Sequence, residues 1–311
     1  MAEGKKYLYG PVTSRRLGLS LGVDIVPFKV CTLDCVYCQL GSTTQKTTER
    51  AEYVSAELVL TELRETLARD LKADFITIGG SGEPTLNSGL GEIIDGIKKI
   101  TDIPVALLTN GTLFYRPDVR ADCINADVVL PSLDAGDKRT FEKINRPHED
   151  IVLENLISGL CLFRNEFAGN IWLEVFFIEG VNTDPSHIAK IKDAIEQIRP
   201  DKVQLNTAVR PTAEAGIKKL TPEKLQDIAE QLGHKAEVAA DFSPGRCGKH
   251  IETKAESVFS MLKRRPCSIN DICSGLGIHR NEALKYVNHF QKKGVVNSSE
   301  KDGIVFFRAL S

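Results

Sequence analysis

The feature that most constrains the fold of this chain is a regular alternation of short β-rich runs with longer amphipathic helical patterns. Because strand–helix alternation builds parallel βαβ units, this part should form an open doubly wound sheet or an incomplete barrel, and periodicity does not choose between them. Both architectures place their chemistry at the C-terminal ends of the strands. Strands are predicted at Leu21–Val26, Phe75–Ile78, Val105–Leu108, Asp127–Leu130, Ile171–Ile178 and Lys202–Leu205. Helices are predicted at Ala56–Leu71, Gly89–Ile100, Pro117–Ile124, Ile151–Phe167, Pro185–Arg199 and Thr221–Leu232.

A Gly- and Pro-rich stretch, Phe242–Lys249, ends the alternation and separates two predicted domains, residues 1–245 and 251–311. The dipeptide Asp302-Gly303 is a strong turn signal, so the last residues should form a β-hairpin. Three helices followed by a hairpin are typical of a small winged helix-turn-helix domain, which we expect to recognise a partner and to contribute no chemistry. Its helices are predicted at Thr253–Lys263, Ser268–Leu276 and Arg280–Lys293, and its hairpin pairs Val295–Asn297 with Ile304–Leu310.

The composition of the 311 residues, 42% hydrophobic and 26% charged, is that of a soluble globular protein and excludes a disordered or fibrous chain. No apolar run reaches the roughly 18 residues of a membrane span, and the first residues lack the apolar region of a secretory signal, so we expect a cytoplasmic protein without a membrane partner. In that compartment the eight cysteines should be metal ligands, buried thiols or redox groups. The net charge is −2, but residues 251–311 hold ten Lys/Arg against six Asp/Glu, which suggests that the two domains have different partners.

The strongest chemical signal is the sequence Cys31-Thr-Leu-Asp-Cys35-Val-Tyr-Cys38, a C-x3-C-x2-C triplet directly after the first predicted strand. Three thiolates on one loop can wrap a single compact metal centre. A [4Fe–4S] cluster normally takes four cysteines, so a cluster on three would leave one iron open for a substrate or a second cofactor. The alternatives are a zinc knuckle that borrows a distant fourth ligand, or chance thiols.

The triplet resembles the defining motif of the radical S-adenosylmethionine (radical SAM) superfamily, in which an aromatic residue, here Tyr37, precedes the last cysteine. The resemblance covers roughly residues 10 to 245, and it is specific because three further motifs of that family occur in order after later strands. Taken singly, each of the three is also an ordinary turn. They are Gly79-Gly80-Ser81-Gly82-Glu83-Pro84, with one residue more than the simplest Gly-Gly-Glu element, Thr109-Asn110-Gly111, and Ser132-Leu133-Asp134.

The resemblance implies an α/β fold, a partial (β/α)6 barrel of the TIM type, with a [4Fe–4S] cluster on Cys31, Cys35 and Cys38. It implies that S-adenosylmethionine chelates the open iron, and that reduction cleaves it to methionine and a 5'-deoxyadenosyl radical that abstracts a hydrogen atom, an oxidoreductase reaction. A reductant such as a flavodoxin or ferredoxin would supply the electron. The implied cofactor contacts are Tyr37 with the adenine, Gly80, Gly82 and Glu83 with the ammonium, and Ser132 and Asp134 with the ribose or carboxylate, with Asn110 of the third motif as a further candidate.

A finer resemblance rests on Ser14-Arg15-Arg16-Leu17-Gly18 together with the segment 81–86, which are similar to the branch that contains the wyosine-forming tRNA enzyme. The match is partial, because that enzyme has a second cluster on additional N-terminal cysteines and this chain has no cysteine before Cys31. Arg15 and Arg16 could contact a carboxylate or a phosphate, and the other interpretation is a pair of solvated arginines.

Glu174 and Asn206, on or after the fifth and sixth predicted strands, are candidates for cofactor binding. A polar residue that points into a parallel barrel needs a partner, whereas an outward-facing residue on an edge strand does not. Cys123 and Cys161 lie in helical patterns and are predicted to be buried thiols. Cys247 is a candidate catalytic residue, a thiol that could donate a hydrogen atom, although an interdomain linker is the commoner interpretation of its surroundings.

These observations favour an iron–sulfur enzyme that acts on an unidentified substrate, either an RNA delivered by the winged helix or a small molecule or protein. The winged helix would then bind a nucleic acid or a protein partner, and its cations could equally form a solvated face. A hypothesis from another class is a redox-sensing transcription regulator that binds DNA through the winged helix. The full set of strand-end motifs argues against that hypothesis, because a sensor needs no S-adenosylmethionine pocket.

Overall fold

The first part of the chain is built on one mostly parallel sheet. The computed structural model describes residues 7–14, 16–69, 71–240, 255–278 and 280–310. Within these residues the sheet has eight strands in the order β1-β2-β5-β6-β7-β8-β9-β10; β1 is antiparallel to β2, and all the other neighbouring pairs are parallel. The strands are β1 Leu8–Ser14, β2 Gly18–Val23, β5 Phe75–Ile78, β6 Val105–Leu108, β7 Val128–Leu130, β8 Asn170–Phe177, β9 Lys202–Thr207 and β10 Ala236–Val238.

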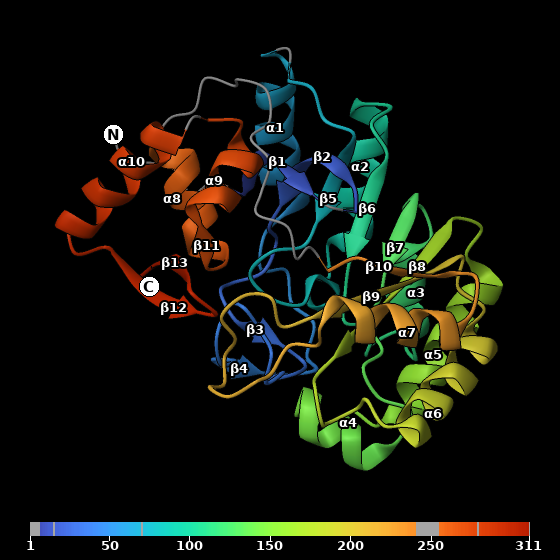
Figure 1. Cartoon of the computed structure of the whole chain (residues 1–311). Coiled ribbons are helices and arrows are strands. Elements are labelled where there is room, and N and C mark those ends of the chain that lie inside the picture. Colours follow the sequence, from blue (N-terminus) through green and yellow to red (C-terminus); the bar gives the residue numbers. More distant parts are fainter. Residues whose placement is uncertain (1–6, 15, 70, 241–254, 279, 311) are drawn as a thin grey trace.

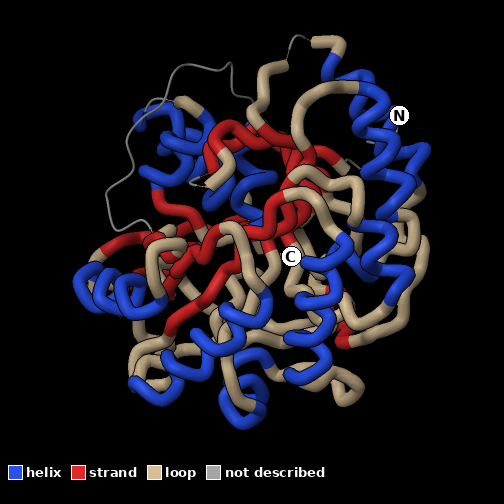
Figure 2. The backbone as a smooth tube through the Cα atoms, turned by 90° about the vertical axis from the view of Figure 1, so that its right-hand side faces the viewer, coloured by secondary structure: helices blue, strands red, loops and turns tan. Residues whose placement is uncertain are grey.

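Several helices between the strands begin at residues that satisfy their first backbone N–H groups. The side chains of Asp137, Asp184 and Thr221 each accept a hydrogen bond from the first turn of the helix that follows. The helices are α1 Ala56–Leu67, the 3-10 turn η1 Pro84–Leu86, α2 Leu90–Ile100, α3 Pro117–Cys123, α4 Lys138–Asn145, α5 Leu153–Glu166, α6 Pro185–Ile198 and α7 Pro222–Leu232. Figure 2 shows the strands in the middle of the molecule with helices around them.

The two sides of the sheet differ in chemistry because alternate residues of a strand face opposite sides. On the outer side, residues such as Leu107 and Leu173 are fully buried in the main apolar core, which also holds the buried faces of the helices. On the inner side, Glu174 and Gln204 are directly paired between β8 and β9 and carry polar side chains. The outer side therefore holds the main core, and the inner side carries these polar groups beside a smaller apolar cluster that includes Ala106, Val128 and Leu130.

Residues 255–310, which we call the C-terminal unit, have an apolar cluster of their own that includes Val258, Ile272 and Val287. Its helix α9 begins with a reciprocal capping box between Ser268 and Asp271. Figure 1 shows the unit, in orange and red, beside β1, with one end reaching toward β3 and β4. Its elements are α8 Ala255–Arg264, β11 Cys267–Ser268, α9 Ile269–Leu276, α10 Arg280–Lys292, β12 Val296–Lys301 and β13 Ile304–Ala309.

Each of the six strands and six helices predicted for the first part has a counterpart, although β2 begins three residues before the predicted Leu21 and α1 ends four residues before the predicted Leu71. The sequence pattern does not predict β1, β10 or α4. Strand β1 is interrupted at Gly10-Pro11, where its register with β2 shifts. Strand β10 has only three residues, too few to show the alternation of a strand. Helix α4 is mostly polar, so its apolar face is narrow.

The predicted hairpin of the C-terminal unit is present and longer than expected, because β12 extends from Val296 to Lys301. The predicted linker Phe242–Lys249 lies outside the described residues. No helix that the structure describes combines the length and the apolar character needed to cross a membrane.

Candidate functional site

The three cysteines of the triplet lie on the loop after β2, where the short strand β3 (Val30–Cys31) pairs with β4 (Gln45–Lys46). All three thiols are free and belong to partly exposed residues. Each sulfur has its own nitrogen donor, and the three donors come from different parts of the chain. Asn110 Nδ2 is 3.5 Å from Cys31 Sγ, Asn145 Nδ2 is 3.4 Å from Cys35 Sγ, and Lys29 Nζ is 3.2 Å from Cys38 Sγ.

The chemistry of these thiols fits a metal cluster. Burial raises the pKa of the Cys31 thiol to about 12, with the Glu83 carboxylate as the next cause. Burial and the Asp134 carboxylate likewise hold the pKa of the Cys35 thiol well above its usual range. Such thiols are neutral at pH 7 unless a bound cation compensates the thiolate charge, as iron does in a cysteine-ligated cluster.

The Gly79–Pro84 segment after β5 lies directly against the cysteine loop. Glu83 N donates a hydrogen bond of 3.0 Å to Val30 O, next to Cys31. Gly82 has no room for a side chain, because a Cβ atom would lie 2.1 Å from Val30 O. The cysteine loop and the glycine-rich segment therefore form one surface at the C-terminal ends of β2 and β5.

Glu83 links the second motif to the third. Its carboxylate is 2% exposed and accepts four hydrogen bonds, three at Oε1 and one at Oε2. The donors are Thr85 N, Thr85 Oγ1, Thr109 Oγ1 and Asn110 N, at 3.1, 2.6, 2.6 and 2.7 Å. Oε1 is fully used by its three donors, whereas Oε2 accepts one hydrogen bond and keeps one acceptor position. Glu83 therefore holds the loops together, and its backbone is bonded to Val30 O and Leu86 N. Its contact with the ammonium stays a prediction.

Asp134, after β7, is also committed to the protein. Its Oδ2 accepts hydrogen bonds of 2.5 Å from Tyr37 Oη and 2.7 Å from Asn145 Nδ2, and its Oδ1 accepts one of 2.9 Å from Phe176 N. Burial raises the pKa of this carboxyl to about 6, although the three donors oppose the shift. The side chain therefore holds the cysteine loop, and its contact with the ribose or methionine carboxylate stays a prediction.

The ring of Tyr37 stacks on Phe176 with centroids 3.9 Å apart, so one face of the ring is already covered. Its predicted contact with an adenine stays a prediction. Ser132, half-buried, lies beside Glu174 through a parallel β-bridge, at the end of β7. Gly80 lies in the same glycine-rich segment as Gly82 and is half-buried.

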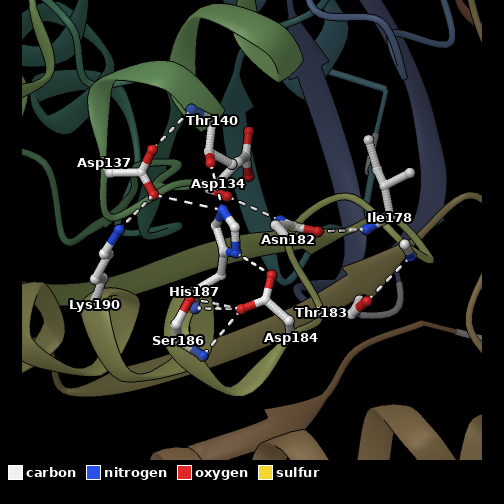
Figure 3. Close-up of polar contacts among 11 residues, drawn as sticks. Asp134, Asp137, Thr140, Ile178, Asn182, Thr183, Asp184, Ser186, His187 and Lys190 are labelled. Atoms are coloured by element: carbon white, nitrogen blue, oxygen red, sulfur yellow. Dashed lines mark hydrogen bonds and ion pairs between the residues drawn. The ribbon is translucent and has the colours of Figure 1, made fainter.

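A second layer of polar contacts holds the Asp134 loop from behind, as Figure 3 shows. Asn182 Nδ2 donates hydrogen bonds of 2.9 Å to Asp134 O and Phe176 O. Farther from the cysteines, His187 Nε2 lies 2.6 Å from Thr140 Oγ1 and connects α6 with α4. The motif formed by residues 132–134 is therefore held in place by Asn182, which follows β8.

Comparison with known proteins identifies this arrangement. A family model described as "Radical SAM superfamily" matches residues 25–160. A UPF0026 protein of Methanocaldococcus jannaschii is 32% identical over 308 residues, which cover 96% of this chain and 94% of that protein. A UPF0026 protein of Helicobacter pylori is 31% identical over 86% of this chain and 87% of its own length. The chain is a radical SAM enzyme of the UPF0026 family.

Another relative, named GTPase Obg, from Brachyspira hyodysenteriae, is 38% identical over 303 residues, and the chain spans only 44% of its length. Among solved structures, a radical SAM methyltransferase from Sphaerobacter thermophilus superposes with a TM-score of 0.57 at 16% identity and covers 72% of this chain and 67% of that one. SuiB of Streptococcus suis bound to S-adenosylmethionine gives a TM-score of 0.52 at 15% identity, over 76% of this chain and 54% of that one. At these identities the likeness shows the fold alone.

The mostly parallel sheet of this radical SAM enzyme thus matches the partial barrel of the superfamily. Its cofactors are a [4Fe–4S] cluster and S-adenosylmethionine, as the superfamily membership indicates. The comparisons support a radical SAM enzyme, and they give no support to the alternative hypothesis of a redox-sensing transcription regulator.

The inner side of the barrel holds the remaining predicted residues. Arg16, in the turn between β1 and β2, forms an ion pair with Glu174, and its side chain is only 20% exposed. Asn206 Nδ2 is 3.4 Å from the other carboxylate oxygen of Glu174. Both Glu174 and Asn206 therefore face inward, and Arg16 is not a solvated arginine. Arg15 lies outside the described residues.

A cavity of about 480 Å³ lies next to Arg16, at the edge of the sheet that β9 and β10 form. The buried Gln204 donates a hydrogen bond of 2.9 Å to Glu237 on the neighbouring strand. Its Oε1 atom is buried without a hydrogen-bond partner among the described residues. The cavity is lined by Arg16, Lys202, Gln204, Glu237 and residues 238–240.

Sequence reasoning missed two residues that touch the cysteine sulfurs, Lys29 and Asn145. Lys29 is 3% exposed, and a charged residue within the otherwise apolar run Ile25–Val30 was a usable signal for it. Asn145 is 110 positions from Cys35, and no local pattern connects them. Asn110 contacts the cysteine loop through Cys31, and its predicted contact with the cofactor stays a prediction.

The described cysteines outside the triplet differ in their burial. Cys123 is buried, as predicted, and Cys161 is partly exposed on α5. Cys267 and Cys273 are buried in the C-terminal unit. Cys247, the candidate hydrogen-atom donor, lies outside the described residues.

Proposed function

We propose that this radical SAM enzyme holds its cluster on Cys31, Cys35 and Cys38 and binds S-adenosylmethionine against the Gly79–Pro84 segment. The observation that carries the proposal is the nitrogen donor placed at each of the three sulfurs. Hydrogen bonds to cluster sulfurs stabilise their charge and help to set the reduction potential. One of the donors, Lys29, is a buried cation, which would favour the reduced cluster.

When bound, the cluster and S-adenosylmethionine supply reductive cleavage to methionine and a 5'-deoxyadenosyl radical that abstracts a hydrogen atom, the general reaction of the superfamily. The residues of this chain orient and enclose those groups. Gly82 lets the glycine-rich segment approach the cysteine loop closely, so that Gly80 and Gly82 would present their backbone to the cofactor, and Glu83 and Asp134 keep the surrounding loops in place. Ser132, Glu174 and Asn206 stand along the inner side, where the ribose would lie.

We infer that the substrate binds on the inner side of the barrel, next to the Arg16–Glu174 pair and the 480 Å³ cavity. The charged side chains of Arg16, Lys202 and Glu237 line this cavity and would contact a substrate there. The substrate is accordingly expected to be polar. This side is also the one that the radical would reach.

We further propose that residues 251–311 form a winged-helix domain that brings an RNA substrate to the barrel, in the cytoplasm and with a flavodoxin or ferredoxin as reductant. Support comes from the exposed cations Lys285, Lys292 and Lys293 on and after α10. The partial likeness of the N-terminal motifs to a tRNA-modifying branch points the same way. A protein-binding role for this domain is the outcome expected if RNA does not bind.

The cluster assignment is tested by anaerobic reconstitution, which should give about four irons and four sulfides per chain. Alanine at Cys31, Cys35 or Cys38 should abolish the cluster, whereas Cys123→Ala, which removes a buried thiol elsewhere, should retain it. The reduced enzyme should form 5'-deoxyadenosine slowly even without substrate. Zinc in place of iron in protein purified without oxygen would overturn the assignment, and an intact reduced cluster that does not respond to S-adenosylmethionine would overturn the cofactor site.

The RNA role is tested by binding of total tRNA to the full-length protein at several salt concentrations. If the cations of α10 contact phosphates, affinity should fall steeply with salt, and a Lys285→Gln, Lys292→Gln, Lys293→Gln triple variant should lower both the affinity and the salt slope. Absence of binding at low salt, where electrostatic attraction is strongest, rejects the RNA role.

A further inference from the structure

Arg264, the last residue of α8, makes its closest polar contact outside the C-terminal unit. Its Nη1 atom donates a hydrogen bond of 2.7 Å to Asp24 Oδ2, at the end of β2. Its guanidinium carbon lies 3.3 Å from the centroid of the Tyr9 ring on β1. The two side chains of the ion pair are 18% and 12% exposed, so water screens them little.

Asp24 also binds the glycine-rich segment, and so links it to Arg264. Its Oδ1 atom accepts a hydrogen bond of 3.1 Å from Ser81 N, and its Oδ2 atom accepts a short one from Ser81 Oγ. The carboxylate thus receives both hydrogen-bond donors of Ser81 and one from Arg264. Ser81 is the residue by which this segment exceeds the simplest Gly-Gly-Glu element.

Tyr9 connects Arg264 to the other end of the same segment. Its phenol donates a hydrogen bond of 3.0 Å to Gly79 O. Burial raises the pKa of this phenol, so it stays a donor at neutral pH. Its ring lies flat on Gly22, where a Cβ atom would be 2.0 Å from the ring. The position of the ring is therefore fixed between the sheet and the guanidinium.

Gly80, between the two anchored residues, lies against the ion pair itself. A Cβ atom at this position would be 2.8 Å from Asp24 Cγ and 3.0 Å from Arg264 Nη1. Three consecutive residues, 79 to 81, are thus held by one network whose outermost member belongs to the C-terminal unit.

We infer that Arg264 is a positioning residue for S-adenosylmethionine: through Asp24 and Tyr9 it fixes the backbone of Gly79–Ser81 in the conformation that receives the cofactor. The inference rests on the proposed function of that segment. It assigns the C-terminal unit a part in cofactor binding, in place of the expected role in partner recognition alone.

Other contacts of the unit reach the same end of the barrel and keep α8 in place. Lys301 Nζ donates hydrogen bonds of 2.7 and 3.1 Å to Ala208 O and Arg210 O, after β9. Arg308 donates a short hydrogen bond to Leu40 O, two residues after Cys38. The unit therefore contacts the cysteine loop, the glycine-rich segment and the end of β9, and Arg264 supplies the contact to the glycine-rich segment.

The first test is hydrogen–deuterium exchange in the full-length, cluster-free protein, which does not depend on activity. Arg264→Gln should speed exchange of the amides of residues 79–81. Lys263→Gln is the matched control, because Lys263 is the neighbouring cation and its ammonium lies 4.9 Å over the Phe259 ring within the C-terminal unit. Unchanged exchange in Arg264→Gln would overturn the inference.

The second test is equilibrium dialysis of S-adenosylmethionine with the reconstituted holoenzyme. Loss of a charge-assisted hydrogen bond that orders the site should raise the Kd about tenfold in Arg264→Gln. The rate of uncoupled cleavage at saturating S-adenosylmethionine should change little, so the effect should appear in KM and not in kcat. Arg264→Lys should recover part of the affinity, because it restores the charge without the planar contact on Tyr9.

Ser81→Ala gives a second variant in case Arg264→Gln does not fold. It removes one hydrogen bond to Asp24 from the loop side and should raise both the exchange rate and the Kd in the same direction. Equal Kd values in the wild type, Arg264→Gln and Ser81→Ala would overturn the inference. If the wild-type holoenzyme itself fails to bind S-adenosylmethionine, the proposed function fails, while exchange in the cluster-free protein still decides the role of Arg264.

Discussion

The cysteine loop and the C-terminal unit both contact the C-terminal ends of the strands, but different kinds of contact hold them there. The loop and the motifs around it are tied together by two buried carboxylates, Glu83 and Asp134, whose donors are mainly neutral groups. The C-terminal unit is attached mainly by cationic side chains. Its own Lys301 and Arg308 reach backbone carbonyl groups of the first part, and Arg210 of the first part pairs with its Asp271 at 2.7 Å.

The cysteine loop therefore belongs to a site that is formed within the first part of the chain, whereas the C-terminal unit is docked against that part. Buried carboxylates with every oxygen paired cannot move without losing several hydrogen bonds at once, so the loops they join are rigid. The Lys301 and Arg308 contacts each depend on one flexible side chain, whereas Arg264 is held against both Asp24 and Tyr9. We therefore expect substitutions in the first group to change folding, and substitutions in the second to change mainly ligand binding.

The largest effect is expected from Glu83→Gln. An amide has one acceptor oxygen where the carboxylate accepts four hydrogen bonds, so buried donors lose their partners. The free energy of unfolding should fall by about 3 kcal/mol, measured by urea denaturation of the cluster-free protein. Glu92→Gln, at an exposed position in the first turn of α2, is the control. A loss no larger than that of the control would break the comparison.

An intermediate effect is expected from the titration of Asp134. Its pKa in the folded protein, about 6, lies above the ordinary value of 3.8, so the folded state binds the proton more tightly. The stability that this group contributes is present below about pH 4 and is lost as the pH rises through 6. The loss attributable to Asp134 should be about 2–3 kcal/mol.

Urea denaturation of cluster-free wild type and Asp134→Asn between pH 4.5 and 7.5 measures this component. The variant cannot ionise at this position, so its stability should depend less on pH, whatever its absolute value. Parallel pH profiles for the two proteins would show that the pKa of Asp134 is not raised in the folded state.

The smallest effect is expected at the rim of the C-terminal unit. Lys219 and Asp302 form an ion pair of 2.7 Å whose side chains are 38% and 47% exposed. Lys219→Gln should change the free energy of unfolding by less than about 0.5 kcal/mol, because exposed pairs are screened and flexible. It should also leave the Kd for S-adenosylmethionine unchanged in equilibrium dialysis. A tenfold change in that Kd would mean that docking as a whole, and not the Arg264 network, controls cofactor binding.

The sequence by itself determined the class of the fold and the centre of the site. Strand–helix alternation predicted the parallel strands from β2 to β9, because period and length are local properties. The cysteine spacing and the three following motifs predicted the superfamily, because ligands on one short loop are also local. The same reasoning predicted the three helices and the hairpin of the C-terminal unit.

Only the tertiary structure decided what the polar residues do. Glu83 and Asp134 have the sequence context of ligand contacts, yet they hold loops together through partners that lie up to 97 residues away. Arg16 was equally compatible with solvent, and the inner side of the barrel gave it Glu174. Arg264 carries no motif and is 240 residues from Asp24. A hydrogen bond between segments so distant leaves no periodic signal in the chain, because burial and partner are set only when the segments pack.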